Sequence, residues 1–335
     1  MRERLVWGDW ARILGLYLVI LGHFFPGMVK SFIFSFHVPF FFFMSGYFTT
    51  YKSNNFRKHL TQTLIIPYLL ICMINAYIGI DNTNSIIPTF ANILLGFHGL
   101  DNLIFGGGNG CQEMWFVYTL ILIKITDHYI YEIRYQIVIS IISIIFVYML
   151  NEKKINIAWS VTDFFICFPF FVMGKWLKLS NNLNNDCKLN AFFTRILSKG
   201  SVSCGIIILL LIFQYVISYI NGVATVVIAD YGKNIILFYI LGCTGSFMVI
   251  LISKYKTIFK SWNRVRILSM GSILVLGFHM HFVRLFNSVI FKELNIPSDY
   301  GCYIASAIIL LLFIPITSFV MKCVPFLIGK KYEKI

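Results

Sequence analysis

Residues 7–48 decide the fold of this chain, and they read WGDWARILGLYLVILGHFFPGMVKSFIFSFHVPFFFFMSGYF. The stretch holds two apolar runs of about 20 residues, as expected for two membrane-spanning helices joined by a tight loop. Each run carries polar groups that a bilayer excludes. The first contains Asp9, Arg12 and His23, and the second contains His37, Pro39, Ser45 and Gly46. A charged side chain at the bilayer centre costs roughly 2.5–3.5 kcal/mol or more, so such residues indicate a functional site.

Arg12 and His23 lie on the same face of the first predicted helix. Eleven residues at about 100° each make three turns plus about 20°, and the helical rise separates the two side chains by roughly 16 Å. Asp9 precedes Arg12 by three residues and can pair with its guanidinium. One face of this helix therefore carries both an ion-paired cation, Arg12, and a titratable base, His23. The structural alternative is a snorkelling arginine and a core histidine that is satisfied by its neighbours.

The composition is that of a polytopic membrane protein. The chain has 335 residues, of which 58% are hydrophobic and 13% are charged, about half the charged fraction of a soluble domain. No part of it reads as a separate soluble domain, so we expect a single transmembrane domain over residues 1–335. The net charge of +14 does not predict nucleic-acid binding, because the basic residues lie in short loops between apolar segments.

Apolar runs of about 20 residues predict an all-α bundle of about ten transmembrane helices. They cover residues 7–25, 32–50, 62–80, 114–130, 135–150, 159–177, 202–220, 234–252, 268–290 and 301–321. Lys and Arg gather on one side of this arrangement, and the loops of the other side hold only Lys30, Lys153, Lys154, Lys233 and Lys292. By the positive-inside rule the basic side is the cytoplasm, and an even number of spans places both termini there.

The spacing of Arg12 and His23, followed by SFHVPFFFFMSGYF, resembles the integral-membrane acyltransferase family 3. This family O-acetylates bacterial surface polysaccharides and includes fucose 4-O-acetylase-like proteins. Later segments extend the resemblance over nearly the whole chain, since Trp115-Phe116 opens the fourth predicted helix and a Phe-rich segment ends at Gly174. The resemblance implies acetyl transfer from cytoplasmic acetyl-CoA to a sugar hydroxyl of a cell-surface or exported glycan, such as O-antigen, capsule or exopolysaccharide.

The ninth predicted helix contains two further histidines, His279 and His281. Ser272 and His279 are seven residues apart, which is similar to the family's Ser-to-His pattern. His281 follows two residues later and points about 200° away, so at most one of the two rings can face the first helix. Histidines at i and i+2 diverge on a helix and no carboxylate lies nearby in the sequence, so we expect no metal site.

The predicted topology gives each polar residue a role in acetyl transfer. The titratable residues in the outer halves of the predicted helices are His23, His37, Glu113 and His279. Arg12, paired with Asp9, is expected to hold the phosphates of acetyl-CoA near the cytoplasm. The distance from Arg12 to His23 then suits the extended pantetheine arm, with the thioester near His23.

The predicted chemistry is direct acyl transfer. Neutral His23 takes the proton of the sugar hydroxyl, which attacks the thioester carbonyl. The resulting oxyanion needs hydrogen-bond donors, and His37, Ser45 and His279 are candidates. Glu113 and Trp115 are expected to support the substrate site. A relay through an acyl-enzyme on Ser or His is the second possible mechanism.

Two other classes of membrane protein are alternatives: a glycan transporter or flippase, and a glycan polymerase. No repeat of the two halves is visible, which disfavours a transporter. The outer loop 81–112 contains no Arg or Lys, which disfavours a polymerase. We expect a multi-pass protein of the cytoplasmic (inner) membrane of a bacterium. Its expected partners are acetyl-CoA, a glycan or lipid-linked sugar acceptor and membrane lipids, with no nucleic acid.

Overall fold

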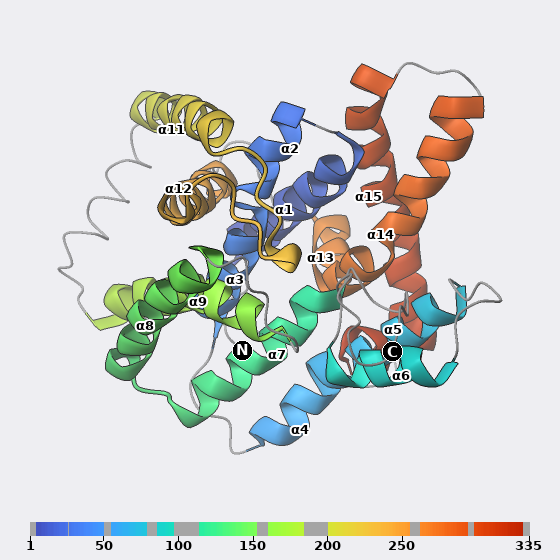
Figure 1. The fold of residues 1–335 in the computed structure, drawn as a ribbon. Coiled ribbons are helices and arrows are strands. Elements are labelled where there is room, and N and C mark those ends of the chain that lie inside the picture. Colours follow the sequence, from blue (N-terminus) through green and yellow to red (C-terminus); the bar gives the residue numbers. More distant parts are fainter. Residues whose placement is uncertain are drawn as a thin grey trace.

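A computed structural model describes residues 5–25, 27–49, 55–78, 86–96, 114–152, 160–183, 200–254, 262–293 and 298–330 (Figure 1). Over these ranges the chain is helical, with one isolated bridge between Thr225 and Asp230 and no strand. The elements up to residue 152 are α1 (Val6–Phe24), α2 (Gly27–Phe34), α3 (His37–Phe48), α4 (Phe56–Leu60), the π-helix η1 (Thr61–Ile65), α5 (Ile66–Ile78), α6 (Ile86–Leu95), α7 (Trp115–Tyr129) and α8 (Ile133–Glu152). The later elements are α9 (Val161–Leu183), α11 (Gly200–Asn221), η3 (Val226–Ile228), α12 (Ile235–Ser253), α13 (Asn263–Met270), α14 (Ser272–Leu285), the π-helix η4 (Phe286–Glu293), α15 (Ser298–Cys323) and η5 (Pro325–Ile328).

Among the described residues, seven helical stretches are long and apolar enough to cross a membrane. They are Gly27–Phe48, Phe56–Ile78, Ile133–Asn151, Cys204–Asn221, Ile235–Ser253, Ser272–Glu293 and Tyr300–Cys323. The prediction of an all-helical, multi-pass membrane protein is therefore confirmed. The other predicted spans, 7–25, 114–130 and 159–177, coincide with α1, α7 and α9, which are short or carry charged residues. The total of ten spans and the cytoplasmic location of both termini stay predictions.

Two of the predicted spans are interrupted. The span predicted over 32–50 contains a turn at 35–36, which separates α2 from α3. The span predicted over 268–290 is broken at Gly271, where a Cβ atom would collide with the side chain of Thr317 on α15. Sharp changes of helix direction at small residues are common in membrane bundles. Here they bring the ends of short helices, with their polar side chains, into the interior of the protein.

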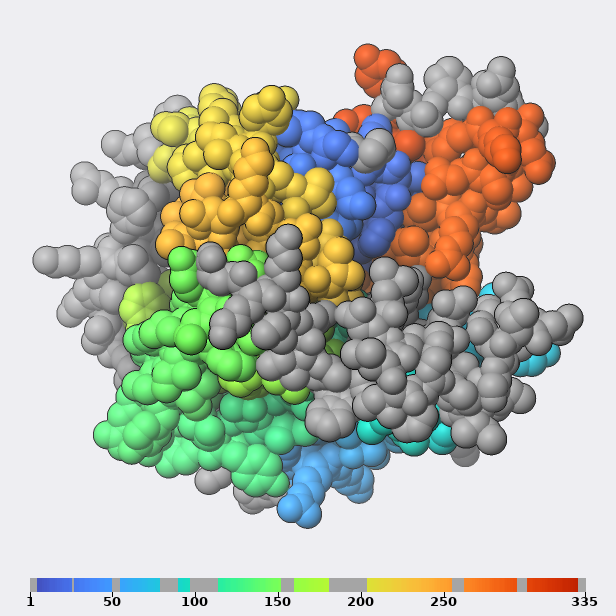
Figure 2. All heavy atoms as spheres, in the orientation of Figure 1, coloured from blue at the N-terminus to red at the C-terminus, as the bar shows by residue number. Residues whose placement is uncertain are grey.

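Helix α1 lies at the centre of the fold. It packs against α12 and α3 and also against α13, α14 and α15 (Figure 1). In the space-filling view its region (blue) is visible between the yellow and gold atoms of α11 and α12 and the orange atoms of the C-terminal helices (Figure 2). Ala11, Leu16 and Ile20 are fully buried. Because other helices surround α1, its polar residues find partners within the protein.

Helices α3 and α9 approach each other through two glycines. Gly46 of α3 lies against the carbonyl group of Phe171, and Gly174 of α9 lies against the carbonyl group of Phe43, so a Cβ atom at either position would overlap a backbone oxygen. Small residues permit such close contact between helix backbones in membranes. The glycines of the two Phe-rich motifs therefore have a packing role, and they fix the end of α3 beside α9.

Candidate active site

Three histidines meet near the end of α1. His23 lies in the last turn of α1, and its ring centroid is 5.1 Å from that of His279 on α14. Phe34 of α2 contacts both His23, at 5.6 Å, and His37, at 4.7 Å between ring centroids. The turn between α2 and α3 permits this arrangement, because His37 begins α3 directly after it. The structure therefore brings together His23, His37 and His279, which we call the histidine cluster.

Backbone carbonyls orient two of these rings. Nδ1 of His37 lies 3.0 Å from the carbonyl oxygen of Ile33, and Nδ1 of His279 lies 3.0 Å from carbonyl oxygens one turn earlier in α14. A carbonyl oxygen only accepts hydrogen bonds, so Nδ1–H donates in both, and Nε2 keeps its lone pair in the neutral ring. His37 and His279 are buried, at 8% and 3% exposure, whereas His23 is exposed. The cluster thus places two rings of fixed orientation beside one exposed imidazole.

The polar group at the other end of α1 is built around Arg12. Its Nη1 lies 3.9 Å from the carboxylate of Asp9, so the predicted ion pair is present. The hydroxyl of Ser269 on α13 donates to Asp9 at 2.6 Å and accepts from Arg12 Nη1 at 3.4 Å. The guanidinium also lies 5.1 Å from the ring centre of Phe48, within the range of a cation–π contact. These contacts hold the guanidinium in a defined position.

A cavity of about 280 Å³ opens beside this guanidinium, and we call it the Arg12 cavity. Its polar lining consists of Arg12, Ser45, Lys124 and Ser272. The apolar lining includes Phe41 and Leu276. Phe41 follows His37 by four residues and Leu276 precedes His279 by three, so the wall reaches within about one helical turn, roughly 5 Å, of both histidines. The Arg12 cavity therefore has cationic groups in its lining, and its apolar wall includes residues close in the helices to two of the clustered histidines.

The other predicted site residues fall in different places. Ser45 lines the Arg12 cavity, and its backbone carbonyl accepts a hydrogen bond from Lys124 at 3.3 Å. Trp115 begins α7 and packs beside Phe116, and it is Phe116 that forms part of the cavity wall. Glu113 lies outside the described residues, so its role stays a prediction.

His281 points away from the histidine cluster, as helical geometry predicts. Its Nε2–H donates to Oδ1 of Asn75 on α5 at 3.0 Å. The amide nitrogen of Asn75 in turn donates to the carbonyl oxygen of Gly277 at 2.9 Å. His281 therefore connects α14 to α5 through a hydrogen-bonded asparagine.

Sequence reasoning did not assign roles to Ser269, Lys124 or Asn75. Lys124 and Asn75 are polar residues within apolar runs, which is a signal that could have identified them. Ser269 gave no comparable signal, because its hydrogen bond to Asp9 joins residues 260 positions apart in the chain.

Comparison with known proteins identifies the family of the chain. Residues 5–328 match the acyltransferase domain of acyltransferase family 3. The chain therefore belongs to this family and is a multi-pass membrane acyltransferase, so the resemblance seen in the sequence is confirmed. No curated protein and no solved structure matches the chain significantly. Among the described residues there is no group of three His, Cys, Asp or Glu side chains that could hold a metal ion.

Proposed function

We propose that the protein is an O-acetyltransferase that moves an acetyl group from acetyl-CoA to a sugar hydroxyl of a cell-surface or exported glycan. The observation that carries the proposal is the Arg12 cavity, which combines cationic lining groups with wall residues about one helical turn from His37 and His279. Acetyl-CoA has anionic phosphates at one end and a thioester at the other, and guanidinium groups bind phosphates well. Family membership supports acyl transfer over transport or polymerisation.

In this proposal the two substrates reach the cluster from opposite sides. The donor enters from the cytoplasm, with the Arg12 guanidinium near its phosphates and the pantetheine arm in the Arg12 cavity. The glycan or lipid-linked sugar approaches the exposed ring of His23. The cytoplasmic (inner) membrane of a bacterium is where these two pools meet, and the chain acts there as one transmembrane domain.

His23 acts as the general base of the reaction. It takes the proton of the acceptor hydroxyl as the oxygen attacks the thioester carbonyl. The tetrahedral intermediate collapses with cleavage of the carbon–sulfur bond, which forms the acetyl ester and the CoA thiolate. The proton held by His23 then passes to the thiolate. His279 lies against His23 and positions the ring for both transfers.

The orientation of the rings narrows the choice of oxyanion donors. Nδ1–H of His37 and of His279 donates to backbone carbonyls, so a neutral ring at either position has no N–H to offer. Ser45 follows His37 by eight residues, roughly 12 Å along α3, and therefore belongs to the donor-binding end. Once His23 has taken the acceptor proton, its imidazolium N–H is the group that donates to the oxyanion in this mechanism.

The proposal is tested with purified protein in lipid nanodiscs and with whole cells. Acetyl-CoA labelled in the acetyl group should transfer label to an added glycan, with release of free CoA. Mass spectrometry of surface glycan from cells with and without the protein should show a difference of one acetyl group per modified sugar. His23→Ala at equal expression is the matched control. Glycans of identical mass, together with no CoA release, would show that the proposal is wrong.

A further inference from the structure

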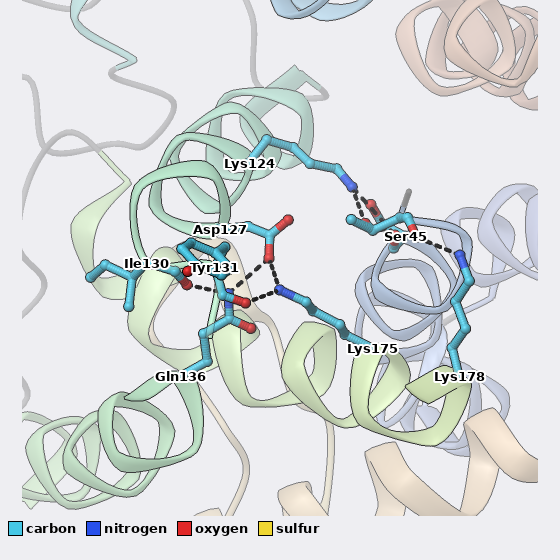
Figure 3. A network of polar contacts seen from close by, with 9 residues as sticks. Ser45, Lys124, Asp127, Ile130, Tyr131, Gln136, Lys175 and Lys178 are labelled. Atoms are coloured by element: carbon cyan, nitrogen blue, oxygen red, sulfur yellow. Dashed lines mark hydrogen bonds and ion pairs between the residues drawn. The ribbon is translucent and has the colours of Figure 1, made fainter. Parts of the chain in front are cut away.

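A second cavity lies beyond the Arg12 cavity and is lined by lysines. It has a volume of about 200 Å³. Among the described residues, its charged lining comprises Lys124 on α7, Lys175 and Lys178 on α9, and one carboxylate, Asp127. We call it the lysine cavity. Figure 3 shows Lys175 pointing toward Asp127, whereas Lys124 and Lys178 approach the region of Ser45 from opposite sides.

One of the contacts drawn in Figure 3 is an ion pair. Lys175 pairs with Asp127 at 2.5 Å and donates to the carbonyl oxygen of Tyr131 at 3.0 Å. Lys124 donates to the hydroxyl of Thr49 at 2.5 Å, and Lys178 donates to the carbonyl oxygen of Thr49. Hydroxyl and carbonyl groups accept hydrogen bonds without neutralising a charge. Three lysines against one carboxylate therefore leave the described wall with a positive excess.

These lysines differ from surface residues that anchor a protein at the inner leaflet. An anchoring lysine extends its ammonium group outward, to water and to lipid headgroups. The side chain of Lys175 is only 8% exposed, and Lys124 lies over the ring of Phe171, 4.8 Å from its centre. The ammonium groups of Lys175 and Lys124 are thus directed into the protein, and concentrated positive charge there indicates a binding site for an anion.

The two cavities are adjacent, and together they line the donor path of this proposal. They share Phe48, Leu64 and Lys124 as lining residues. The order along the path is therefore the histidine cluster, Arg12, Lys124 and then the pair Lys175 and Lys178. The predicted topology places the lysine end nearest the cytoplasm, because the segments beside it are the basic inner loops.

We propose that the lysine cavity binds the 3′-phosphate and adjoining nucleotide of the acyl donor, the end farthest from the thioester. This inference rests on the proposed function, in which the donor is a CoA thioester. With the thioester at the histidine cluster and the diphosphate at Arg12, the remaining phosphate lies further toward the cytoplasm, beside the lysines. Phosphate oxygens there accept charge-assisted hydrogen bonds from Lys124 and Lys178 without breaking the Lys175–Asp127 pair.

The test compares the binding of CoA and of 3′-dephospho-CoA by calorimetry. Wild-type protein in phosphatidylcholine nanodiscs should bind CoA about tenfold or more tightly than dephospho-CoA, as expected for one or more charge-assisted hydrogen bonds. Lys178→Gln should reduce this preference and leave the binding of dephospho-CoA unchanged. Lys124 lines both cavities, so Lys124→Gln should reduce the preference and also weaken the binding of dephospho-CoA. Lys322→Gln removes the same charge from an exposed site at the end of α15 and should behave as wild type.

A second variant removes the buried ion pair without leaving a lone charge. Lys175→Gln combined with Asp127→Asn deletes both partners, which avoids an unpaired buried carboxylate. Since this change leaves the net charge of the cavity unaltered, the preference for CoA should survive in the double variant. The opposite pattern would overturn the proposal. In that pattern Lys178→Gln and Lys124→Gln keep the preference for CoA, and the double variant loses it.

The remaining outcomes separate this inference from the proposed function. Equal binding of CoA and dephospho-CoA by wild-type protein overturns the inference and leaves acetyl transfer intact. A normal preference for CoA without any acetyl transfer counts against the proposed function only. Anionic lipid is tested by adding phosphatidylglycerol to the nanodiscs. If it weakens CoA binding by wild type but not by Lys178→Gln, the cavity holds a lipid headgroup and the inference is wrong.

Discussion

The two polar ends of α1 differ in their surroundings. Arg12 is held by Asp9 and Ser269 at the wall of a cavity, whereas His23 is exposed and lies against His279. A residue that binds the donor equally in the ground state and the transition state affects KM, and a residue that moves a proton affects kcat. Substitutions at the two ends should therefore produce different kinetic changes.

Arg12→Ala should weaken the binding of acetyl-CoA. A charge-assisted hydrogen bond contributes roughly 1.5–3 kcal/mol, so we expect KM for acetyl-CoA to rise about 10- to 150-fold while some turnover persists at saturation. Arg12→Lys should recover only part of the loss, because a point charge replaces a planar fork of donors. Steady-state kinetics measures both effects. An unchanged KM in Arg12→Ala would remove Arg12 from the donor site.

His23→Ala should reduce kcat by roughly 10²–10⁴-fold, the usual contribution of a general base. Acetyl-CoA should still bind, because the donor's phosphates lie at the other end of the path. Calorimetry of acetyl-CoA binding and steady-state transfer to a glycan test the two statements. Near-normal turnover would mean that another residue is the base, with His37 or Glu113 next to be tested.

His279→Ala should reduce activity far more than His281→Ala at equal expression. His279 touches His23, whereas His281 bonds to Asn75. Loss of His281 leaves a buried amide oxygen without this donor, so we expect a stability cost of about 1–3 kcal/mol with kcat largely retained. Transfer assays and thermal unfolding of both variants provide the comparison. Equal losses of activity would contradict the assignment of His279 to the site.

At the scale of the helices, the close contact of α3 and α9 holds both cavities in shape. Ser45 and Phe48 come from α3, and Lys175 and Lys178 come from α9. The contact depends on Gly46 and Gly174, because any side chain there would meet a backbone oxygen that has no room to move.

Gly174→Ala should destabilise the protein by about 1–3 kcal/mol, the usual cost of overpacking. We expect a lower Tm in detergent and weaker CoA binding, since α9 must move away from α3. Gly205→Ala on α11 is the matched control, because a Cβ atom there meets nothing within 4 Å. Alanine at that exposed helical position should be neutral or stabilising by up to about 1 kcal/mol. Identical Tm shifts in both variants would refute a packing role for Gly174.

At the scale of the whole molecule, the mechanism requires two sides. The lysine cavity and Arg12 must open to the cytoplasm, and His23 must face the opposite side of the membrane. The uneven distribution of Lys and Arg among the loops is the basis for this orientation.

Reporter fusions test the orientation directly. A fusion at Lys188 and one at the C-terminus should report a cytoplasmic location, and a fusion near Gly107 should report the outside. All three fusions should be made in the full-length chain and compared at equal expression. A cytoplasmic signal near Gly107 would exclude the two-sided mechanism along with the topology.

The sequence by itself determined the class of the protein and the geometry within single helices. Apolar runs predict membrane helices without knowledge of their neighbours. The lipid provides the apolar surroundings, and each helix forms the hydrogen bonds of its own backbone N–H and C=O groups. The same-face placement of Arg12 and His23, and the divergence of His279 and His281, follow from the helical repeat. The roles of these residues and of Glu113 stay predictions for the assays above.

Only the tertiary structure decided which helices meet. The contact of Ser269 with Asp9, the approach of His279 to His23 and the convergence of Lys124 with α9 all join residues far apart in the chain. Such contacts depend on how side chains of several helices fill the shared space, and no local repeat encodes that. The breaks at 35–36 and at Gly271 arise in the same way, because the packing of the bundle decides where an apolar run bends.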